Sequence, residues 1–240
     1  MTLILPVEMP LIGGAQQYFE PMAISYQSPE AGGRIGSVQA GPAKWEAEWS
    51  IGRIGARASD EWRAWVARIR LTSRPFFARD RARPYPLRYP GGFARMTLAD
   101  ASGPFVGAAS GWSQEIDEQG DALLTLEGLP SGLILSVGDY VGFRWDAAEG
   151  DAGNMARRAL VRCETGDMTD ASGEVTVRVV PPVPVAGEGL MGVVPSDAIA
   201  HLDRPACVMK MPHGDRPLGP IDRRLAITGG SIKAMQELLP

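Results

Sequence analysis

The residues of this chain that could do chemistry lie first of all in two short acidic runs. Asp and Glu stand close together in W-D-A-A-E-G-D (residues 145–151) and in G-D-M-T-D (residues 166–170). A carboxylate pair is what a glycoside hydrolase needs, and clustered carboxylates also bind calcium. Neither run matches an EF-hand loop or an Asp-rich nonapeptide repeat. We therefore favour solvated turn carboxylates over a catalytic pair or a calcium site.

The two histidines are the next candidates, because each has an Asp nearby. His201 stands in D-A-I-A-H-L-D and His213 in M-P-H-G-D, while Ser131, Ser136 and Ser196 are available as nucleophiles. No G-x-S-x-G elbow places any of these serines, and closeness in sequence says little about geometry. We expect no catalytic triad.

Cysteine spacing and glycine-rich motifs give no sign of a metal or a cofactor. Cys163 and Cys207 are isolated, and neither they nor the histidines have the spacing of a zinc site. A single Cys163–Cys207 bridge stays possible. There is no phosphate-binding G-x-x-x-x-G-K-[ST], and G-G-R-I-G (residues 32–36) has the wrong spacing for a dinucleotide. The sequence predicts no catalytic residue, no cofactor and no bound metal.

Charge is distributed unevenly along the chain. Residues 1–96 hold 13 Lys or Arg against 8 Asp or Glu, residues 97–200 hold 5 against 16, and residues 201–240 hold 6 against 4. A basic stretch beside an acidic one suits contact between copies of one chain, because opposite potentials fix the register of the contact. We predict an oligomer interface in the arginine-rich segment, at Arg74, Arg79, Arg81, Arg83 and Arg88. The alternative is a solvated surface with accidental clustering.

Nucleic acid is a further alternative partner for this segment. In residues 74–90 the arginines alternate with Phe76, Phe77, Tyr85 and Tyr89, as in proteins that stack bases. Four prolines make the stretch a stiff connector, however, and the acidic part of the chain would repel nucleic acid. We expect no specific nucleic-acid binding.

We expect a mainly β, α+β fold with one helix, over residues 59–70, to position these segments. Ser59 is expected to be its N-cap, with Asp60 and Glu61 in the first turn. A stripe at helical spacing, formed by Trp62, Trp65, Val66 and Ile69, predicts the buried face, and we expect Trp62, Trp65 and Ile69 to be structural core. Upstream, residues 45–51 alternate as in a half-buried strand, and residues 76–77 continue as a strand after the helix.

The remainder reads as short strands separated by Gly-Asp and Pro-Gly turns. We expect strands near 104–114, 121–127, 133–145, 157–165 and 174–180, and two more at 206–211 and 225–235. We expect the last strand to return to the first sheet. The domains expected are residues 1–95, a β-sheet or barrel with the packed helix, completed by 205–240, and residues 96–204, an acidic all-β sandwich or barrel that would then be an insertion, with the boundary near 91–102.

Two further observations concern partners and location. Residues 27–42 form a long, Gly-rich stretch poor in large apolar groups, which is typical either of an arm that orders on a neighbouring subunit or of a plain surface loop. The chain has no apolar run long enough to cross a membrane, and M-T-L-I-L-P-V-E lacks the features of a signal peptide. We expect no membrane span and synthesis in the cytoplasm.

The order of these blocks resembles a protein family. The succession W-R-A-W-V-A-R-I-R-L, L-T-L-E-G-L-P-S-G-L-I-L-S-V-G-D-Y-V-G, R-R-A-L-V-R, D-A-S-G-E-V-T-V-R-V-V-P-P-V-P and R-P-A-C-V-M-K-M is similar to distal-tail or tail-tip structural proteins of long-tailed bacteriophages and prophages. The resemblance covers roughly residues 45–211. It implies a homo-oligomeric, hexameric ring in the virion that joins the tail tube to the baseplate hub, with a ring-forming N-terminal domain and an outward acidic domain. The implied partners are further copies of the chain, the tail tube protein and hub or tail-tip proteins, with the tape measure protein as a further candidate.

Two other functions are compatible with the sequence. The first is a carbohydrate-binding β module that contacts the host surface, with Trp112 or Trp145 as a stacking platform, although both tryptophans fit a core role better. The second is an envelope-degrading hydrolase, which would require a carboxylate pair in a cleft.

Overall fold

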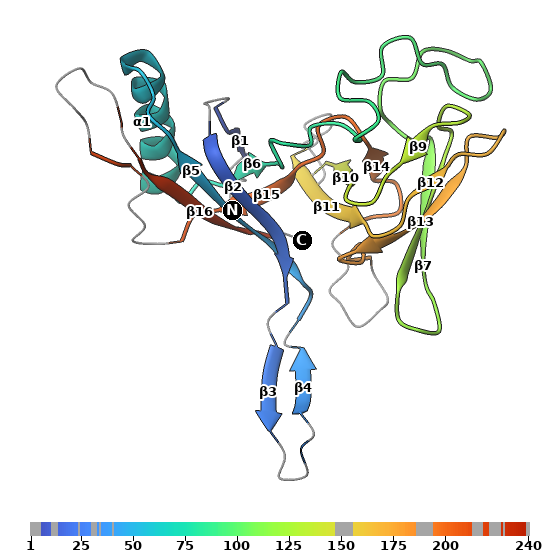
Figure 1. Cartoon of the computed structure of the whole chain (residues 1–240), viewed down its shortest axis with the longest axis horizontal. Helices are drawn as coiled ribbons and strands as arrows, with labels where there is room; N and C mark the ends of the chain where they lie inside the picture. The colour runs from blue at the N-terminus through green and yellow to red at the C-terminus, as the bar shows by residue number, and fades with distance from the viewer. Residues whose placement is uncertain are drawn as a thin grey trace.

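The computed structural model describes residues 6–10, 14–23, 25–29, 33, 35–39, 41–146, 156–185, 194–212, 218–220, 227 and 229–238. Within these residues the chain is mainly β, with one helix and two six-stranded sheets, which confirms the predicted fold class (Figure 1). No helix of the described part is long and apolar enough to cross a membrane.

The first sheet takes its strands from both ends of the chain. Its order is β1-β6-β15-β16-β5-β2, and its strands are β1 (Val7–Glu8), β2 (Gly14–Met22), β5 (Lys44–Ile51), β6 (Phe76–Ala78), β15 (Cys207–Lys210) and β16 (Ser231–Gln236). β16 pairs with β5, so the prediction that the C-terminal strand returns to the first sheet is confirmed. The second sheet therefore lies between two parts of the first in sequence, which is the arrangement of an insertion.

Alternation of apolar and polar residues explains the central strands of this sheet. In β5 every second residue is buried, beginning with Trp45 and including Trp49, as the period of a half-buried strand requires. In β16 the buried positions likewise alternate, with Ile232 and Ala234 inside. The predicted strand 45–51 is thus correct to within one residue.

Helix α1 (Ala56–Leu71) covers one face of the first sheet (Figure 1). Its buried stripe includes Trp62, Trp65, Val66 and Ile69, and Trp65 contacts Phe76 of β6 edge to face, with ring centroids 5.1 Å apart. Aromatic pairs of this geometry add to the free energy gained by burial. The strand, helix, strand unit expected here is present as β5, α1 and β6.

The start of this helix was predicted wrongly. The helix begins one turn earlier, with Gly55 at the N-cap and no acidic residue in its first turn. Ser59 is buried inside the helix, and its backbone N–H donates to the carbonyl of Gly55. Asp60 and Glu61 form side-chain pairs with Arg63 and Arg57 on the exposed face, so their place is explained by neighbours on the helix and not by capping.

The second sheet is antiparallel, in the order β14-β10-β11-β13-β8-β7. Its strands are β7 (Gly111–Ile116), β8 (Ala122–Glu127), β10 (Tyr140–Trp145), β11 (Arg157–Cys163), β13 (Val175–Val180) and β14 (Ile199–His201). The backbone of Ala109, just before β7, donates to the carbonyl of Ala200 at 2.9 Å, and Leu202 donates to Gly107 at 2.7 Å. The two edges of the sheet therefore meet, which closes it like a barrel, one of the two arrangements that the sequence predicts for this block.

Two predicted strands of this block differ in extent. The strand expected at 104–114 begins only at Gly111, and the one expected at 133–145 is divided into β9 (Ile134–Leu135) and β10 by a turn at Ser136–Asp139. β9 pairs with β12 (Asp167–Met168) as a separate ribbon. Gly138, with φ of 83°, adopts the left-handed conformation that makes this turn possible.

Packing passes from the first core to the second earlier in the chain than predicted. Tyr85, Tyr89 and Phe93 pack with the second-sheet cluster, whereas Ala78 still belongs to the first. The change therefore falls between residues 78 and 85, ahead of residues 91–102, because the aromatic residues of the connector bury themselves against the second sheet.

Candidate functional site

A two-stranded hairpin projects from the body of the molecule. β3 (Ser25–Pro29) and β4 (Ile35–Gln39) pair only with each other among the described strands, and they continue the line of β2 and β5 away from both sheets (Figure 1). Tyr26 and Val38 face each other across the hairpin and are 71% and 70% exposed. We call residues 25–39 the arm. The stretch predicted as an irregular Gly-rich loop thus contains paired strands.

The arm has little of its own to stabilise it. An isolated two-stranded hairpin is marginal in water, because it has no second layer on which to bury apolar side chains. Tyr18 of β2 and Met22, at the base of the arm, are also exposed, so the apolar side chains continue toward the body. An arrangement of this kind becomes stable when a second surface covers it.

The predicted interface arginines divide into two groups. Arg79 lies 2.5 Å from the carboxylate of Glu8, and Arg83 donates to the carbonyl of Val137 at 3.0 Å and lies 3.7 Å from Asp139. The backbone of Arg81 donates to Gln17, and burial, followed by repulsion from Arg79, lowers the pKa of its guanidinium. These three arginines bind their own chain.

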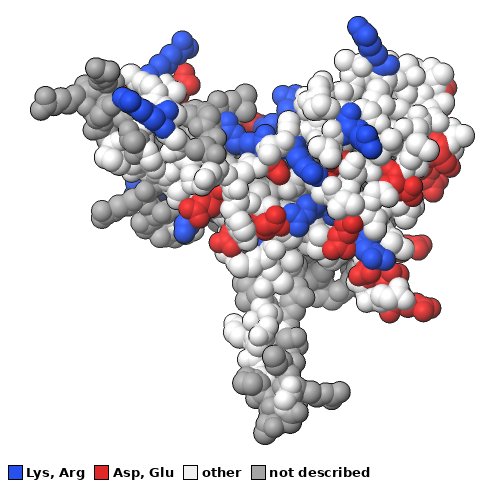
Figure 2. Space-filling model, viewed as in Figure 1, with Lys and Arg blue, Asp and Glu red and all other residues white. Residues whose placement is uncertain are grey.

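The other two arginines are placed differently. Arg88 is exposed, and Arg74 lines a pocket of 500 Å³ between the end of α1 and the end of β15. On the face shown in Figure 2, Asp and Glu gather on the side of the second sheet, which agrees with the acidic middle of the sequence. The uneven charge along the chain is thus also uneven on the surface.

The segment that carries these arginines joins the two sheets through Asp80. Its carboxylate accepts hydrogen bonds from Gln17 of β2, from the backbone of Ala82 at 2.7 Å and from the Tyr140 hydroxyl of β10 at 3.0 Å. Burial and the neighbouring Asp80 raise the pKa of Tyr140. Tyr140 also packs in the first core, against Phe19 and Trp45. The arm's base is therefore fixed relative to the second sheet.

Two further contacts strengthen this junction. The Trp45 indole donates to the carbonyl of Leu160 at 2.7 Å, and Arg162 lies 2.6 Å from Glu20. Both run from β5 or β2 to β11. Together with the bonds of Asp80, these contacts fix the first sheet against the second.

The Gly138-Asp139 motif is an anchor and not a reactive site. Asp139 is fully buried, and its two oxygens accept from the backbone of Leu87 at 2.8 Å and of Ser136 at 2.7 Å. Burial raises the pKa of this carboxyl despite those bonds and Arg83. The motif holds the connector against the turn before β10.

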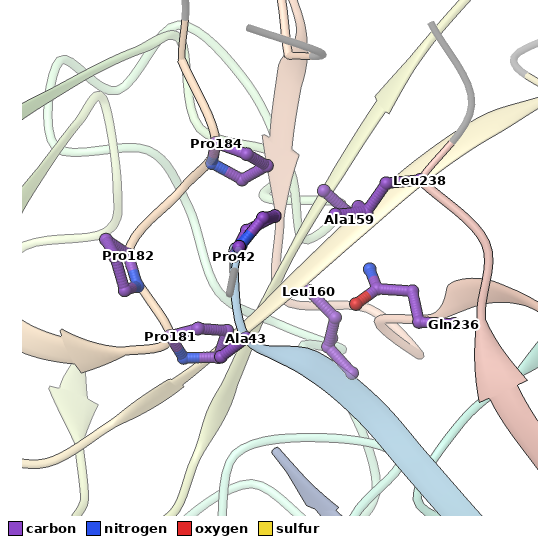
Figure 3. Close-up of a pocket in the computed structure, with 10 residues that line it drawn as sticks. Pro42, Ala43, Ala159, Leu160, Pro181, Pro182, Pro184, Gln236 and Leu238 are labelled. Carbon is purple, nitrogen blue, oxygen red and sulfur yellow. The ribbon is translucent and has the colours of Figure 1, made fainter. Parts of the chain in front are cut away.

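An apolar pocket of 430 Å³ opens at the base of the arm, where β5 meets the second sheet (Figure 3). Three prolines that follow β13 form one wall, and Ala159 and Leu160 of β11 form another; the lining residues labelled there are Pro42, Ala43, Ala159, Leu160, Pro181, Pro182, Pro184, Gln236 and Leu238. The carboxamide oxygen of Gln236 accepts from the backbone of Trp45 at 3.1 Å. Among the described residues its lining carries no charged side chain, so these residues offer mainly apolar contacts.

The candidate catalytic residues form no common site among the described residues. His201 is buried, and its Nδ1 bonds to the carbonyl of Asp203 at 3.0 Å, not to a carboxylate. Asp170 accepts hydrogen bonds from Ser172 and Glu174 within its own turn, which lowers its pKa. No group of three or more His, Cys, Asp or Glu in the described part could hold a metal ion. His213 and residues 147–151 lie outside the described residues.

The cysteines and the tryptophans proposed for sugar stacking are structural. Cys163 and Cys207 are both free and buried, in different cores, so no bridge joins them. The Trp112 indole donates to the carbonyl of Ala198 at 2.7 Å, and its ring packs against Phe143. Trp145 is half-buried against the same cluster. The aromatic residues of 74–90 are likewise buried or half-buried.

The sequence pattern missed two features of this surface. It did not predict strands in the arm, although Tyr26 and Val38 were the available signal. It also did not predict that Arg144 and Arg158 lie opposite each other on β10 and β11, because pairing register is invisible in one sequence. A comparison with models of known protein families finds no match, and a search of curated proteins finds none either.

Proposed function

We propose that the chain is a structural virion protein of a phage tail, which forms a homo-oligomeric, hexameric ring between the tail tube and the tail tip or baseplate hub. It acts by assembly and not by turnover. It is made in the host cytoplasm and resides at the tail tip, in contact with tube and hub proteins; the tape measure protein is a further candidate partner.

The observation that carries this proposal is the arm. Each subunit of a ring contacts its neighbours through two different surfaces, since such contacts are head-to-tail. A projecting hairpin with exposed Tyr26 and Val38 is suited to reach one neighbour, because among the described strands β3 and β4 pair only with each other and a neighbouring subunit would supply a second layer. The resemblance of the sequence blocks to tail proteins is the reason for proposing a tail ring and not another kind of assembly.

The arm is tested by replacing both of its exposed apolar residues. We expect Tyr26→Ser with Val38→Ser to leave each subunit folded and to shift the assembled protein to single subunits in light scattering. The matched control is Leu71→Ser with Val106→Ser, since these residues are 85% and 74% exposed but lie away from the arm. Equal assembly of the two double variants would exclude the arm as the contact.

A further inference from the structure

A second pocket, of 380 Å³, lies where the edge of the first sheet meets the second, and it is rich in arginine. Its charged and titratable lining comes from β1, the end of β6, β10, β11 and the end of β14, and consists of Glu8, Arg79, Arg144, Arg158, His201, Asp203 and Arg204. Figure 2 shows Lys and Arg side chains gathered across the middle of the molecule, where the two sheets adjoin. None of these residues belongs to the arm or to the proline-lined pocket.

Two of the arginines stand directly opposite each other. Arg144 of β10 and Arg158 of β11 are cross-strand partners, and like charges at such positions destabilise a sheet. The Arg158 guanidinium lies over the ring of Phe77, 5.0 Å from its centroid. Burial, and then Arg144, lower the pKa of Arg158 to about 10. The fold therefore holds two positively charged side chains close together, which costs free energy of folding.

The pocket's own carboxylates offset these charges only in part, with Glu8 acting on Arg158. Glu8 pairs with Arg79 at 2.5 Å and Asp203 pairs with Arg204 at 3.1 Å, whereas no ion pair joins Arg144 or Arg158 to a carboxylate in the described part of the chain. The Nε–H groups of Arg144 and Arg158 are buried without a hydrogen-bond partner. An unpaired buried donor on a charged group costs free energy of folding, so an acceptor bound at this site would stabilise the fold.

We propose that this pocket binds an oxyanion of the phosphate class between Arg144 and Arg158. The planar guanidinium groups of two arginines offer forked donors that match the oxygens of a phosphate. A dianion would supply the missing acceptors and balance the excess of guanidinium groups over carboxylates. The volume leaves room for the remainder of a small phosphate ester, so the ligand is either free phosphate or such an ester. The site does not depend on whether the chain forms a ring.

The test compares anions at matched ionic strength, above neutral pH, by thermal unfolding and by calorimetry. We expect inorganic phosphate to raise the unfolding midpoint saturably and sodium chloride to leave it unchanged. Glycerol phosphate, measured in parallel, distinguishes the sources: tighter binding identifies an ester as the ligand, and weaker binding identifies free phosphate. Equal effects of chloride and phosphate would overturn the proposal.

Variants locate the site. Arg158→Gln is expected to raise the midpoint in phosphate-free buffer, since it removes the repulsion, and to weaken phosphate binding at least about tenfold. Arg144→Gln is the second variant, and Arg63→Gln on the exposed face of α1 is the control. A phosphate response that survives both pocket substitutions, or is lost equally in the control, would disprove the assignment.

A spectroscopic signal identifies the site independently of stability. The chain has only two histidines, so the ring protons of His201 can be resolved by NMR, with His213 as internal reference. Phosphate should shift the His201 resonances in the wild type and not in Arg158→Gln. An unchanged His201 signal at saturating phosphate would place any binding elsewhere.

Discussion

At the scale of single residues, His201 is a buried side chain that the second sheet keeps uncharged. The ring is buried, its Nδ1–H donates to the carbonyl of Asp203, and Arg144 and Arg158 stand nearby. Burial, followed by repulsion from these arginines, lowers its pKa from 6.5 to about 4. His201 is therefore neutral at neutral pH in the folded chain, and the fold avoids a further positive charge in the arginine-lined pocket.

This lowered pKa predicts a loss of stability in mild acid. The unfolded chain takes up the proton near pH 6.5 and the folded chain only near 4, so the stabilisation is complete above the first value and is lost as the pH falls through the second. The effect is on the order of 3 kcal/mol. Thermal unfolding measured across this window should show a shallower decline in His201→Asn than in wild type. His213→Asn is the control, and an identical decline in His201→Asn and wild type would contradict the account.

The arginines of the connector also act as individual residues. Arg88 is exposed, whereas Arg83 is bound to Val137 and lies beside buried Asp139. We predict that Arg88→Glu keeps the thermal midpoint and weakens assembly, whereas Arg83→Glu lowers stability by about 1–3 kcal/mol because it places a carboxylate beside Asp139. Chemical denaturation and light scattering on both variants separate these effects. A large destabilisation by Arg88→Glu would contradict the exposed position of the Arg88 side chain.

The helix core gives a third prediction. Trp65 is buried between Trp62 and Phe76, with ring centroids 5.0 Å and 5.1 Å away, so Trp65→Ala should cost about 3–5 kcal/mol as a large-to-small core substitution. Leu71→Ala, on the same helix but 85% exposed, should change the free energy of unfolding by less than about 0.5 kcal/mol. Comparable losses in the two variants would contradict the packing described.

At the scale of elements, α1 begins at a glycine, which gives the helix no side-chain cap. Gly55 has extended backbone angles, its side-chain position is open, and no side-chain hydrogen bond caps the helix. Gly55→Asp should therefore stabilise the chain by about 0.5–1.5 kcal/mol, through a cap and a less flexible unfolded state. Gly55→Ala supplies only the second effect, so the difference between the two measures the cap. No gain over Ala in urea denaturation would mean that the helix starts elsewhere.

The elements also show what one sequence can and cannot predict. The alternation of Trp45, Ala47, Trp49 and Ile51 and the helical stripe from Trp62 to Ile69 are periodic, so they identify β5 and α1 directly. Ser59 led to a wrong prediction of the helix start, because serine is a favoured N-cap residue but can also lie inside a helix, as it does here. The arginine-lined pocket could not be predicted, since it depends on the register that brings Arg144 opposite Arg158 and on the meeting of strands far apart in the chain.

At the scale of the whole molecule, the two sheets share one junction. Tyr140 of the second sheet packs in the first core, and Trp45 of the first donates to Leu160 of the second. Cys207 lies in the first core and Cys163 in the second, and burial raises the pKa of both thiols. Each cysteine therefore reports the opening of its own core.

Because of this junction, we predict that both cores open over the same range of denaturant. Single-cysteine variants, Cys163→Ser and Cys207→Ser, should be unreactive to a thiol reagent when native and should become reactive at a common midpoint. Fully unfolded protein, in which both thiols react, is the control. Separate midpoints would mean that the two sheets unfold independently.

The assembly itself is tested most directly by the mass of the purified chain. Light scattering across a series of protein and salt concentrations, with negative-stain images of the same fractions, should show a rise toward a hexamer and ring-shaped particles. The rise should weaken as salt is added, because charge contributes to the contacts. A single-subunit mass at every concentration and salt, with no rings in the images, would contradict the proposed ring.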